Sequence, residues 1–299
     1  MKNWQFQTMM LVMVIVWAMA FPFIKISLEE LSFITLTILR FLVVCIAFLI
    51  LLILKKNLFS KLRKKDILPI FLLGFFGVMV YHFGLNYGEQ LVSPGAASLI
   101  IATIPVFILI LATIFLKEKV GPIKLFGILL ALAGVVIISL WGKENTNIDF
   151  EYLFAAFAVL IAAIMGAFYT VAGKKLLSRY NALSLTVYAM LLGSIGLIPF
   201  AFLSPNIVEE VTTMSTTVLG SVIFLGLFSS VIGYVVWYVA LEIKSASDIS
   251  AYLYAIPVVA TIASYFLFGD EITLMFILGG ILVIIGLAIV NKKWNQKID

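Results

Sequence analysis

Charge, histidine and cysteine are all scarce in this sequence, and each shortage excludes a class of protein. Only 12% of the 299 residues are charged, about half the share of a soluble globular domain. The single cysteine, Cys45, has no intrachain disulfide partner, and the single histidine leaves no set of ligands for a metal site. No glycine-rich phosphate loop is present. We therefore expect no bound metal, no cofactor and no ATP-driven reaction.

Apolar residues make up 64% of the chain, more than a soluble domain of this size can bury. They form runs of about 17 to 26 residues, the length at which a helix crosses about 30 Å of hydrocarbon. The runs lack the alternation of a membrane barrel strand. The sequence thus predicts an all-α integral membrane protein of ten transmembrane helices, at residues 8–24, 31–54, 67–88, 91–116, 122–142, 152–173, 182–203, 218–241, 246–268 and 272–290.

Basic residues gather on one predicted side of the membrane. All but three of the 20 lysines and arginines lie in the termini, or in loops that share a side with the termini. Such residues are retained on the cytoplasmic side during insertion. We expect a multi-pass protein of the cell (plasma) membrane with cytoplasmic N- and C-termini. The basic stretch at residues 55–65 then faces lipid headgroups, and no nucleic-acid partner is expected.

The chain repeats itself at an offset of 152 residues. This shift superimposes Leu73-Gly74 on Leu225-Gly226, Ile104-Pro105-Val106 on Ile256-Pro257-Val258, and Gly127 and Gly134 on Gly279 and Gly286. A repeat of five helices, an odd number, must enter the bilayer upside down in its second copy. We expect two inverted repeats, at residues 1–142 and 152–299, joined by an outer linker at 143–151. This architecture is typical of secondary transporters.

Short motifs in both halves carry a family resemblance. In the first half they are Trp17, Phe21, Leu39-Arg40-Phe41, Pro105-Val106, Glu118, Gly127 and Gly134. In the second half they are Leu225 to Ser230, Tyr234, Trp237-Tyr238, Ala240-Leu241, Ser245-Ala246, Pro257-Val258, Gly269-Asp270-Glu271, Gly279 and Gly286. Over residues 8–290 the chain resembles two EamA domains of the drug/metabolite transporter superfamily. The first half departs from the pattern at Phe115-Leu116-Lys117-Glu118, where a glycine would precede the acid, and at Tyr81-His82.

The resemblance implies ten helices in two inverted repeats and transport by alternating access. It also implies a central cavity framed by helices 1, 3, 4, 6, 8 and 9.

Polar side chains within the apolar runs are costly in lipid, so each one predicts a partner or a function. His82 and Asn86 lie four residues apart on one face of the third helix, and the repeat offset places Tyr234 and Tyr238 on the eighth helix. We expect these four residues to bind substrate from opposite walls of one cavity. Hydrogen bonding between helices without a ligand is the alternative, and both remain open.

Three charged residues are expected to have a structural or coupling role. Arg40 lies deep in the second helix, where an unpaired charge costs about 3 kcal/mol or more. We expect it to pair with a carboxylate, for which Glu89 is the candidate, or with helix-end carbonyls. Glu89 and Glu242 are expected at opposite mouths of the cavity.

Aromatic and proline residues complete the candidate site. Trp17, Tyr169, Trp237 and Tyr252 lie on four different helices and are expected to line an aromatic cavity that binds substrate. Contact with lipid is the alternative for each. Pro105 and Pro257 fall in the middle of predicted helices at positions related by the repeat, where we expect hinges.

These features favour a secondary transporter over an enzyme. The expected substrate is a small molecule, an amino acid or a similar neutral, zwitterionic or aromatic metabolite, and the expected direction is export. A channel or a lipid scramblase or flippase is the alternative. A membrane enzyme is less favoured because no nucleophile with its base and no cluster of acids is present. We expect a monomer, with a dimer left open.

Overall fold

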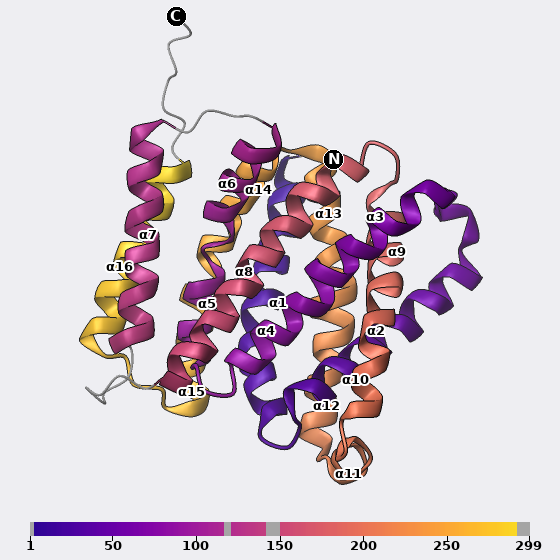
Figure 1. The fold of residues 1–299 in the computed structure, drawn as a ribbon, viewed down its shortest axis with the longest axis horizontal. Helices are drawn as coiled ribbons and strands as arrows, with labels where there is room; N and C mark the ends of the chain where they lie inside the picture. Colours follow the sequence, from indigo (N-terminus) through magenta and orange to yellow (C-terminus); the bar gives the residue numbers. More distant parts are fainter. Residues whose placement is uncertain (1–2, 117–120, 142–149, 292–299) are drawn as a thin grey trace, which may run out of the picture.

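The computed structural model describes residues 3–116, 121–141 and 150–291, and every regular element in these ranges is a helix. Most of the helices run side by side, parallel or antiparallel (Figure 1). The first half contains α1 Asn3–Leu28, α2 Phe33–Leu54, η1 Lys56–Leu58, η2 Lys64–Asp66, α3 Ile67–Gly74, η3 Phe75–Val80, α4 Tyr81–Gly88, α5 Pro94–Ile101, α6 Ile104–Leu116 and α7 Pro122–Trp141.

The second half has a similar order of elements. It contains α8 Phe150–Leu176, α9 Ala182–Ser194, η4 Ile195–Leu197, α10 Ile198–Leu203, α11 Ile207–Thr213, α12 Thr216–Phe224, η5 Leu225–Ile232, α13 Gly233–Ile243, α14 Ala246–Ser250, η6 Ala251–Ala255, α15 Ile256–Phe268 and α16 Leu274–Asn291.

Seven helical stretches of the described chain are long and apolar enough to cross a membrane. They are Asn3–Leu28, Phe33–Leu54, Lys64–Gly88, Pro94–Phe115, Phe150–Leu176, Ala182–Phe202 and Thr216–Ile243. Shorter apolar stretches at Leu125–Ile138, Tyr252–Phe268 and Leu274–Gly286 fall in the other predicted runs. Large apolar side chains cover the outside, such as Phe202 at 85% exposure and Ile53 at 79%. A surface this apolar is suited to lipid rather than to water.

Polar residues fix where several helices begin. Ser32, Ser93, Asn181 and Ser215 each precede a helix and accept a hydrogen bond from the backbone N–H three residues later, at 2.8 to 3.3 Å. These N-terminal amides have no partner within their own helix, so the cap satisfies one of them. The loop residues therefore specify the starts of α2, α5, α9 and α12.

Pro105 and Pro257 lie at the start of new helices rather than in the middle of continuous ones. The predicted helix at 91–116 is broken, because α5 ends at Ile101 and α6 begins at Ile104, so Pro105 is the second residue of α6. Pro257 is likewise the second residue of α15 and follows the 3₁₀ segment η6. A proline in the first turn needs no N–H donor, so it is tolerated there. The expectation of prolines in mid-helix was wrong, whereas a hinge at these breaks stays a prediction.

Two π-helical segments also recur at the repeat offset. η3 lies between α3 and α4, and η5 lies between α12 and α13. A shift of η3 by 152 residues falls inside η5. A π segment rotates the side chains that follow it relative to a regular α-helix. Both halves thus interrupt the helix at corresponding positions, next to the residues that line the site described below.

Helices from the two halves pack into two groups. The first, the α8 group, consists of α8 with α3, η3, α4, α5 and α6. The second, the α1 group, consists of α1 with α12, η5, α13, η6 and α15. α2 packs against η5 and α4, and α9 packs against α3 and α13, so these two helices flank both groups.

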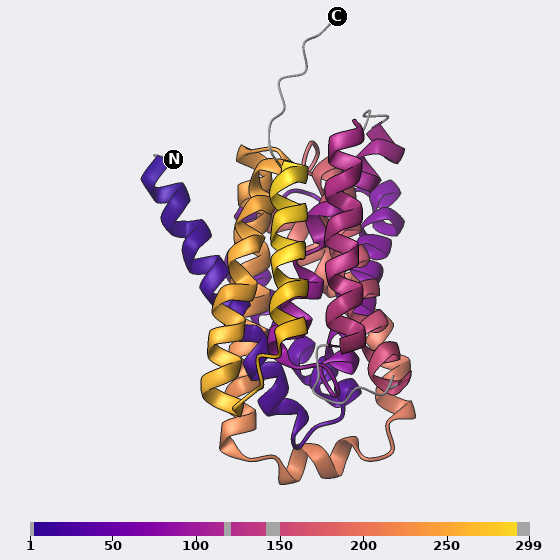
Figure 2. The same ribbon diagram turned by 90° about the vertical axis from the view of Figure 1, so that its left-hand side faces the viewer.

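α7 and α16 form a separate pair at one edge of the molecule, side by side in Figure 2. Their glycines lie close together: a Cβ at Gly127 would meet the Gly286 carbonyl oxygen at 2.8 Å, and one at Gly134 would meet the Gly279 oxygen at 2.5 Å. The repeat offset exchanges these two contacts, since it relates Gly127 to Gly279 and Gly134 to Gly286. Such reciprocity is typical of an interface with twofold symmetry.

Candidate functional site

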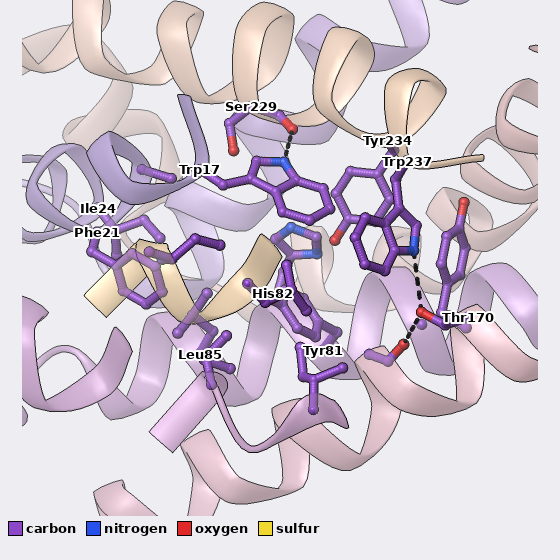
Figure 3. Close-up of a pocket in the computed structure, with 18 of the residues that line it drawn as sticks. Trp17, Phe21, Ile24, Tyr81, His82, Leu85, Thr170, Ser229, Tyr234 and Trp237 are labelled. Carbon is purple, nitrogen blue, oxygen red and sulfur yellow. Dashed lines mark hydrogen bonds between the residues drawn. The ribbon is translucent and has the colours of Figure 1, made fainter. Parts of the chain in front are cut away.

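A cavity lies between the α8 group and the α1 group (Figure 3). The empty space between its side chains, counted together with the open space that adjoins it, is about 680 Å³. Its walls are mostly apolar and aromatic. They are formed by Trp17, Ala20, Phe21, Ile24, Arg40, Gly77, Tyr81, His82, Leu85, Ile101, Ile104, Gly166, Tyr169, Thr170, Ser229, Tyr234, Trp237, Leu253 and Ile256.

The internal repeat accounts for most of this lining. Residues 152 positions apart face the same cavity from the two halves, as in the pairs Trp17 and Tyr169, Gly77 and Ser229, His82 and Tyr234, Leu85 and Trp237, Ile101 and Leu253, and Ile104 and Ile256. The cavity therefore lies where the two halves meet, and each half contributes corresponding positions to it.

Hydrogen bonds fix the two tryptophans of the cavity. The Trp17 indole N–H donates to the Ser229 carbonyl at 2.9 Å, and the Trp237 N–H donates to the Thr170 hydroxyl at 3.2 Å. Figure 3 shows both bonds and the rings gathered around the cavity. The ring centroid of Trp17 lies 5.4 Å from that of Trp237 and 5.6 Å from that of Tyr234. The result is a rigid aromatic wall, suited to apolar, aromatic or cationic groups of a ligand.

Arg40 is the charged residue of the cavity wall, and its surroundings differ from the prediction. Its side chain is only 2% exposed. The guanidinium donates from Nε to the Ser230 hydroxyl at 2.8 Å and from Nη2 to the Ser229 hydroxyl at 3.0 Å. Among the described residues, no ion pair joins Arg40 to Glu89. The expected partner was therefore wrong: two neutral hydroxyls from η5 hold the arginine, and Nη1 has no hydrogen-bond partner there.

His82 and Asn86, the two members of the predicted stripe on α4, have different environments. His82 lines the cavity, and its Nδ1 lies 2.6 Å from the Val78 carbonyl oxygen. Since a carbonyl only accepts, Nδ1 carries the proton in this contact. Asn86 instead donates to the Thr37 hydroxyl of α2 at 2.9 Å and is not among the residues that line the cavity.

The other predicted substrate-binding residues divide in the same way. Tyr169 and Tyr234 line the cavity. Tyr238 lies behind Tyr169, with stacked rings 4.7 Å apart and its hydroxyl donating to the Tyr169 carbonyl at 3.1 Å. Tyr252 packs its ring against Phe6 at 6.2 Å and is also outside the lining.

The two predicted acids lie outside the lining as well. Glu242 accepts from the Ala182 amide at 2.6 Å and so caps the start of α9. Glu89 ends α4; it is fully buried, and neither of its carboxylate oxygens has a hydrogen-bond partner within the described ranges. Pro105 and Pro257 directly follow the lining residues Ile104 and Ile256.

Several lining residues were missing from the prediction. Tyr81, Thr170 and Ser229 contribute hydroxyl groups, and Phe21, Ile24 and Leu85 contribute apolar surface. The repeat offset offered a signal for some of them, because Leu85 corresponds to the predicted Trp237. The offset gives no such signal for Tyr81 or Thr170, although Tyr81 belongs to the Tyr81-His82 departure from the family pattern.

Two lysines connect the helix groups at opposite ends of the molecule. Lys25, near the end of α1, donates to the backbone carbonyls of Glu89 and Gln90 at 3.0 and 3.1 Å. Lys174, near the end of α8, donates to the carbonyls of Leu241 and Lys244. α1 and α8 end at opposite ends of the bundle (Figure 1). The repeat offset relates Glu89 to Leu241, so each half uses a lysine to bind the end of a corresponding helix.

The described residues contain no group of three or more histidine, cysteine, aspartate or glutamate side chains that is arranged to hold a metal ion. The chemistry of the cavity is instead that of a binding site. It combines aromatic faces, a few hydroxyls, one imidazole and one guanidinium.

Comparison with known proteins gives a consistent family assignment. The model of the EamA-like transporter family matches residues 6–140 and again residues 153–292. An uncharacterized transporter of Archaeoglobus fulgidus is 39% identical over 98% of this chain and 100% of its own length. A protein of Streptantibioticus cattleyicolor named "Probable terminal-alkyne amino-acid exporter" is 34% identical over 94% of this chain and 91% of its own length. A solved crystal structure at 16% identity covers 96% of each chain with a TM-score of 0.67, which shows a shared fold.

Proposed function

Because the chain belongs to the EamA-like transporter family, we propose that it is a secondary transporter that exports a small metabolite by alternating access. Ten transmembrane helices form two inverted repeats, at residues 1–142 and 152–299, with the linker 143–151 between them. The protein is a monomer of the plasma membrane with both termini in the cytoplasm.

One observation carries this proposal: the cavity is lined by repeat-related residues from two helix groups, which pack on each other through α5 and α15 and are also joined by lysines at opposite ends. Two nearly equivalent halves around one site give a protein two states of similar energy, one open to each side. The Lys25 contacts hold the groups together at one end, and the Lys174 contacts hold them at the other. Breaking one set while keeping the other opens the cavity to one side at a time.

The substrate is an amino acid or a similar metabolite with an apolar or aromatic side chain. Trp17, Tyr169, Tyr234 and Trp237 offer aromatic faces, whereas Arg40 and His82 offer polar atoms. The name of the S. cattleyicolor relative supports both the amino-acid class and the export direction.

Transport by purified protein in liposomes tests the proposal. Vesicles loaded with unlabelled L-phenylalanine or L-leucine are expected to accumulate the same labelled amino acid by exchange, with a rate that saturates. Empty liposomes are the control. Uptake that rises linearly with concentration, without exchange, would instead indicate a channel, and movement of labelled lipid between leaflets would indicate a scramblase.

A further inference from the structure

The cavity wall contains a buried cation that forms no ion pair with any carboxylate of the described chain. Arg40 is 2% exposed, two serine hydroxyls hold its Nε and Nη2, and its Nη1 has no hydrogen-bond partner within the described ranges. Neutral hydroxyls satisfy donors but do not compensate the charge, and the buried carboxyl of Glu89 acts on Arg40 through space without forming an ion pair with it. A cation at this depth is costly unless an anion neutralises it. The cavity wall therefore presents an open position for an anionic group.

The position of Arg40 breaks the symmetry of the cavity. Most lining residues have a repeat mate that faces the same space, but the offset places Leu192 at the position that corresponds to Arg40. Arg40 is thus the one guanidinium among the lining residues, and the other half of the molecule provides no counterpart. A ligand that carries one anionic group has one place to put it, and this fixes which end of the ligand lies at α2.

Two further polar atoms of the cavity lining lack partners among the described residues. They are Nε2 of His82 and the Tyr169 hydroxyl. Since His82 donates from Nδ1 to the Val78 carbonyl, Nε2 of the neutral ring is an acceptor. Buried polar atoms are normally satisfied, so such a cluster points to a polar ligand group that is not part of the chain. The aromatic wall of Trp17, Tyr234 and Trp237 is available for the apolar part (Figure 3).

We propose that Arg40 binds the carboxylate of the substrate, with Ser229 and Ser230 as positioning residues that hold its guanidinium toward the cavity. The transported metabolites are then carboxylates, and the amides of the same molecules, which lack the negative charge, are excluded. This inference rests on the proposed transport function, because it names the group by which the substrate is recognised. The charge-assisted contact is formed only when the carboxylate enters.

Matched pairs of ligands test the proposal in liposomes that contain the purified protein. The probes are L-phenylalanine and L-leucine with their amides, L-phenylalaninamide and L-leucinamide, which keep the ammonium and the side chain but lose the carboxylate. The wild type is expected to prefer each acid by about 10- to 100-fold, the range for one charge-assisted hydrogen bond. Arg40→Gln should reduce that ratio toward one, and Arg40→Lys should retain part of it. The ratio is measured within each variant, so differences in folded yield cancel.

Two further variants serve as a control and as a substitute for Arg40→Gln. Arg179→Gln is the matched control, because this arginine pairs with Asp66 at 2.7 Å, away from the cavity, so the ratio should stay unchanged. Should Arg40→Gln fail to fold, Ser230→Ala keeps the charge but removes the Nε contact, and it should raise KM for the acids several-fold more than for the amides. If Arg40→Gln leaves the preference for acid over amide unchanged, Arg40 does not bind the carboxylate, although the protein is still a transporter. The same conclusion follows from an unchanged preference in Ser230→Ala when only that variant folds. Wild-type exchange of neither acids nor amides would overturn both.

Discussion

His82 and Asn86 are one helical turn apart on α4, yet they have different surroundings. Asn86 donates to the Thr37 hydroxyl of α2, whereas His82 donates to the Val78 carbonyl of its own helix and lines the cavity; Oδ1 of Asn86 and Nε2 of His82 both lack partners within the described ranges. Polar contacts between membrane helices are worth about 0.6 to 2 kcal/mol. Asn86 thus joins α4 to α2, and His82 faces the cavity. The same division separates Tyr234 from Tyr238.

Cysteine substitution is expected to separate these two kinds of residue. In a Cys45→Ser background, cysteines at positions 82 and 234 should react with a small water-soluble thiol reagent, and a transported amino acid should slow the reaction. Cysteines at 86 and 238 should react at least about 10-fold more slowly, because neither position lines the cavity. The measurement is the labelling rate in intact liposomes. Fast labelling at 86 and 238 with no reaction at 82 and 234 would move the pathway to another face.

Sequence patterns predict such residues only in part. A spacing of four places His82 and Asn86 on one face, but it does not show which helix that face meets. The hydroxyls that hold Arg40 lie 189 and 190 residues further along the chain, so only the folded packing reveals them. Glu89 was chosen as the partner of Arg40 because the expected topology places both in the outer half of the membrane, and this choice was wrong. The aromatic members Trp17, Tyr169 and Trp237 were predicted because they are aromatic side chains on helices that the family resemblance places at the cavity.

At the scale of helices, the lysine contacts at the ends of α4 and α13 are expected to set the balance between the two access states. Lys25→Met removes two hydrogen bonds from an ammonium group at one end, and Lys174→Met removes two at the other. Each loss should shift the balance by about 1 to 2 kcal/mol, or roughly 5- to 30-fold, in opposite directions. The readout is labelling of a cysteine at position 234 by a membrane-impermeant reagent added from either side.

The neighbouring exposed lysine provides the control for this experiment. Lys175→Met removes the same charge next to Lys174 and should leave the labelling pattern unchanged. If Lys25→Met and Lys174→Met both shifted the labelling toward the same side of the membrane, the two lysine contacts would not close opposite ends of the cavity.

Packing between α7 and α16 depends on glycines, and a second helix-scale prediction follows from it. A Cβ at Gly134 would lie 2.5 Å from the Gly279 carbonyl oxygen. Gly134→Ala should therefore push the helices apart and cost about 1 to 3 kcal/mol of stability. Gly220→Ala is the matched control, since a Cβ there meets nothing within 4 Å, and the better helix propensity of alanine should raise stability slightly. Thermal unfolding in detergent measures both, and equal melting temperatures for the two variants would contradict the close approach.

For the molecule as a whole, the repeat offset predicted more than the apolar runs did. The runs located the helical stretches, but they could not reveal the breaks before Pro105 and Pro257 or the π segments η3 and η5, because these depend on packing rather than on hydropathy. The offset of 152, by contrast, relates most lining residues of the cavity and the reciprocal glycine contacts of α7 and α16. Two similar halves that share one interface leave this signature in the sequence itself.

Loop contacts make the expected topology testable at this scale. The loops expected in the cytoplasm meet each other: the Asn181 side chain donates to the Leu58 carbonyl at 3.0 Å, and the Arg63 amide donates to the Tyr180 hydroxyl at 3.1 Å. The loops expected outside also meet, since the Ser215 amide donates to Glu30 at 2.6 Å and the Ser32 amide donates to Glu210 at 3.1 Å. The Ser215 contacts hold the pKa of the Glu30 carboxyl below its usual value, so this carboxylate stays charged near neutral pH.

One end of the molecule is thus basic and the other carries acids, and insertion retains basic loops in the cytoplasm. Reporter fusions after residue 60 and at the C-terminus should both report the cytoplasm, and a fusion after residue 145 should report the outside. A sharper experiment changes the distribution of basic residues between the two sides. Replacing the basic residues of the 55–65 loop with glutamine should raise the fraction of misoriented chains, whereas the same number of glutamines in place of outer acids should have little effect, because acids contribute little to orientation. A C-terminus on the outside would contradict the inverted repeat, because two odd-numbered units of opposite orientation return the chain to the side from which it started.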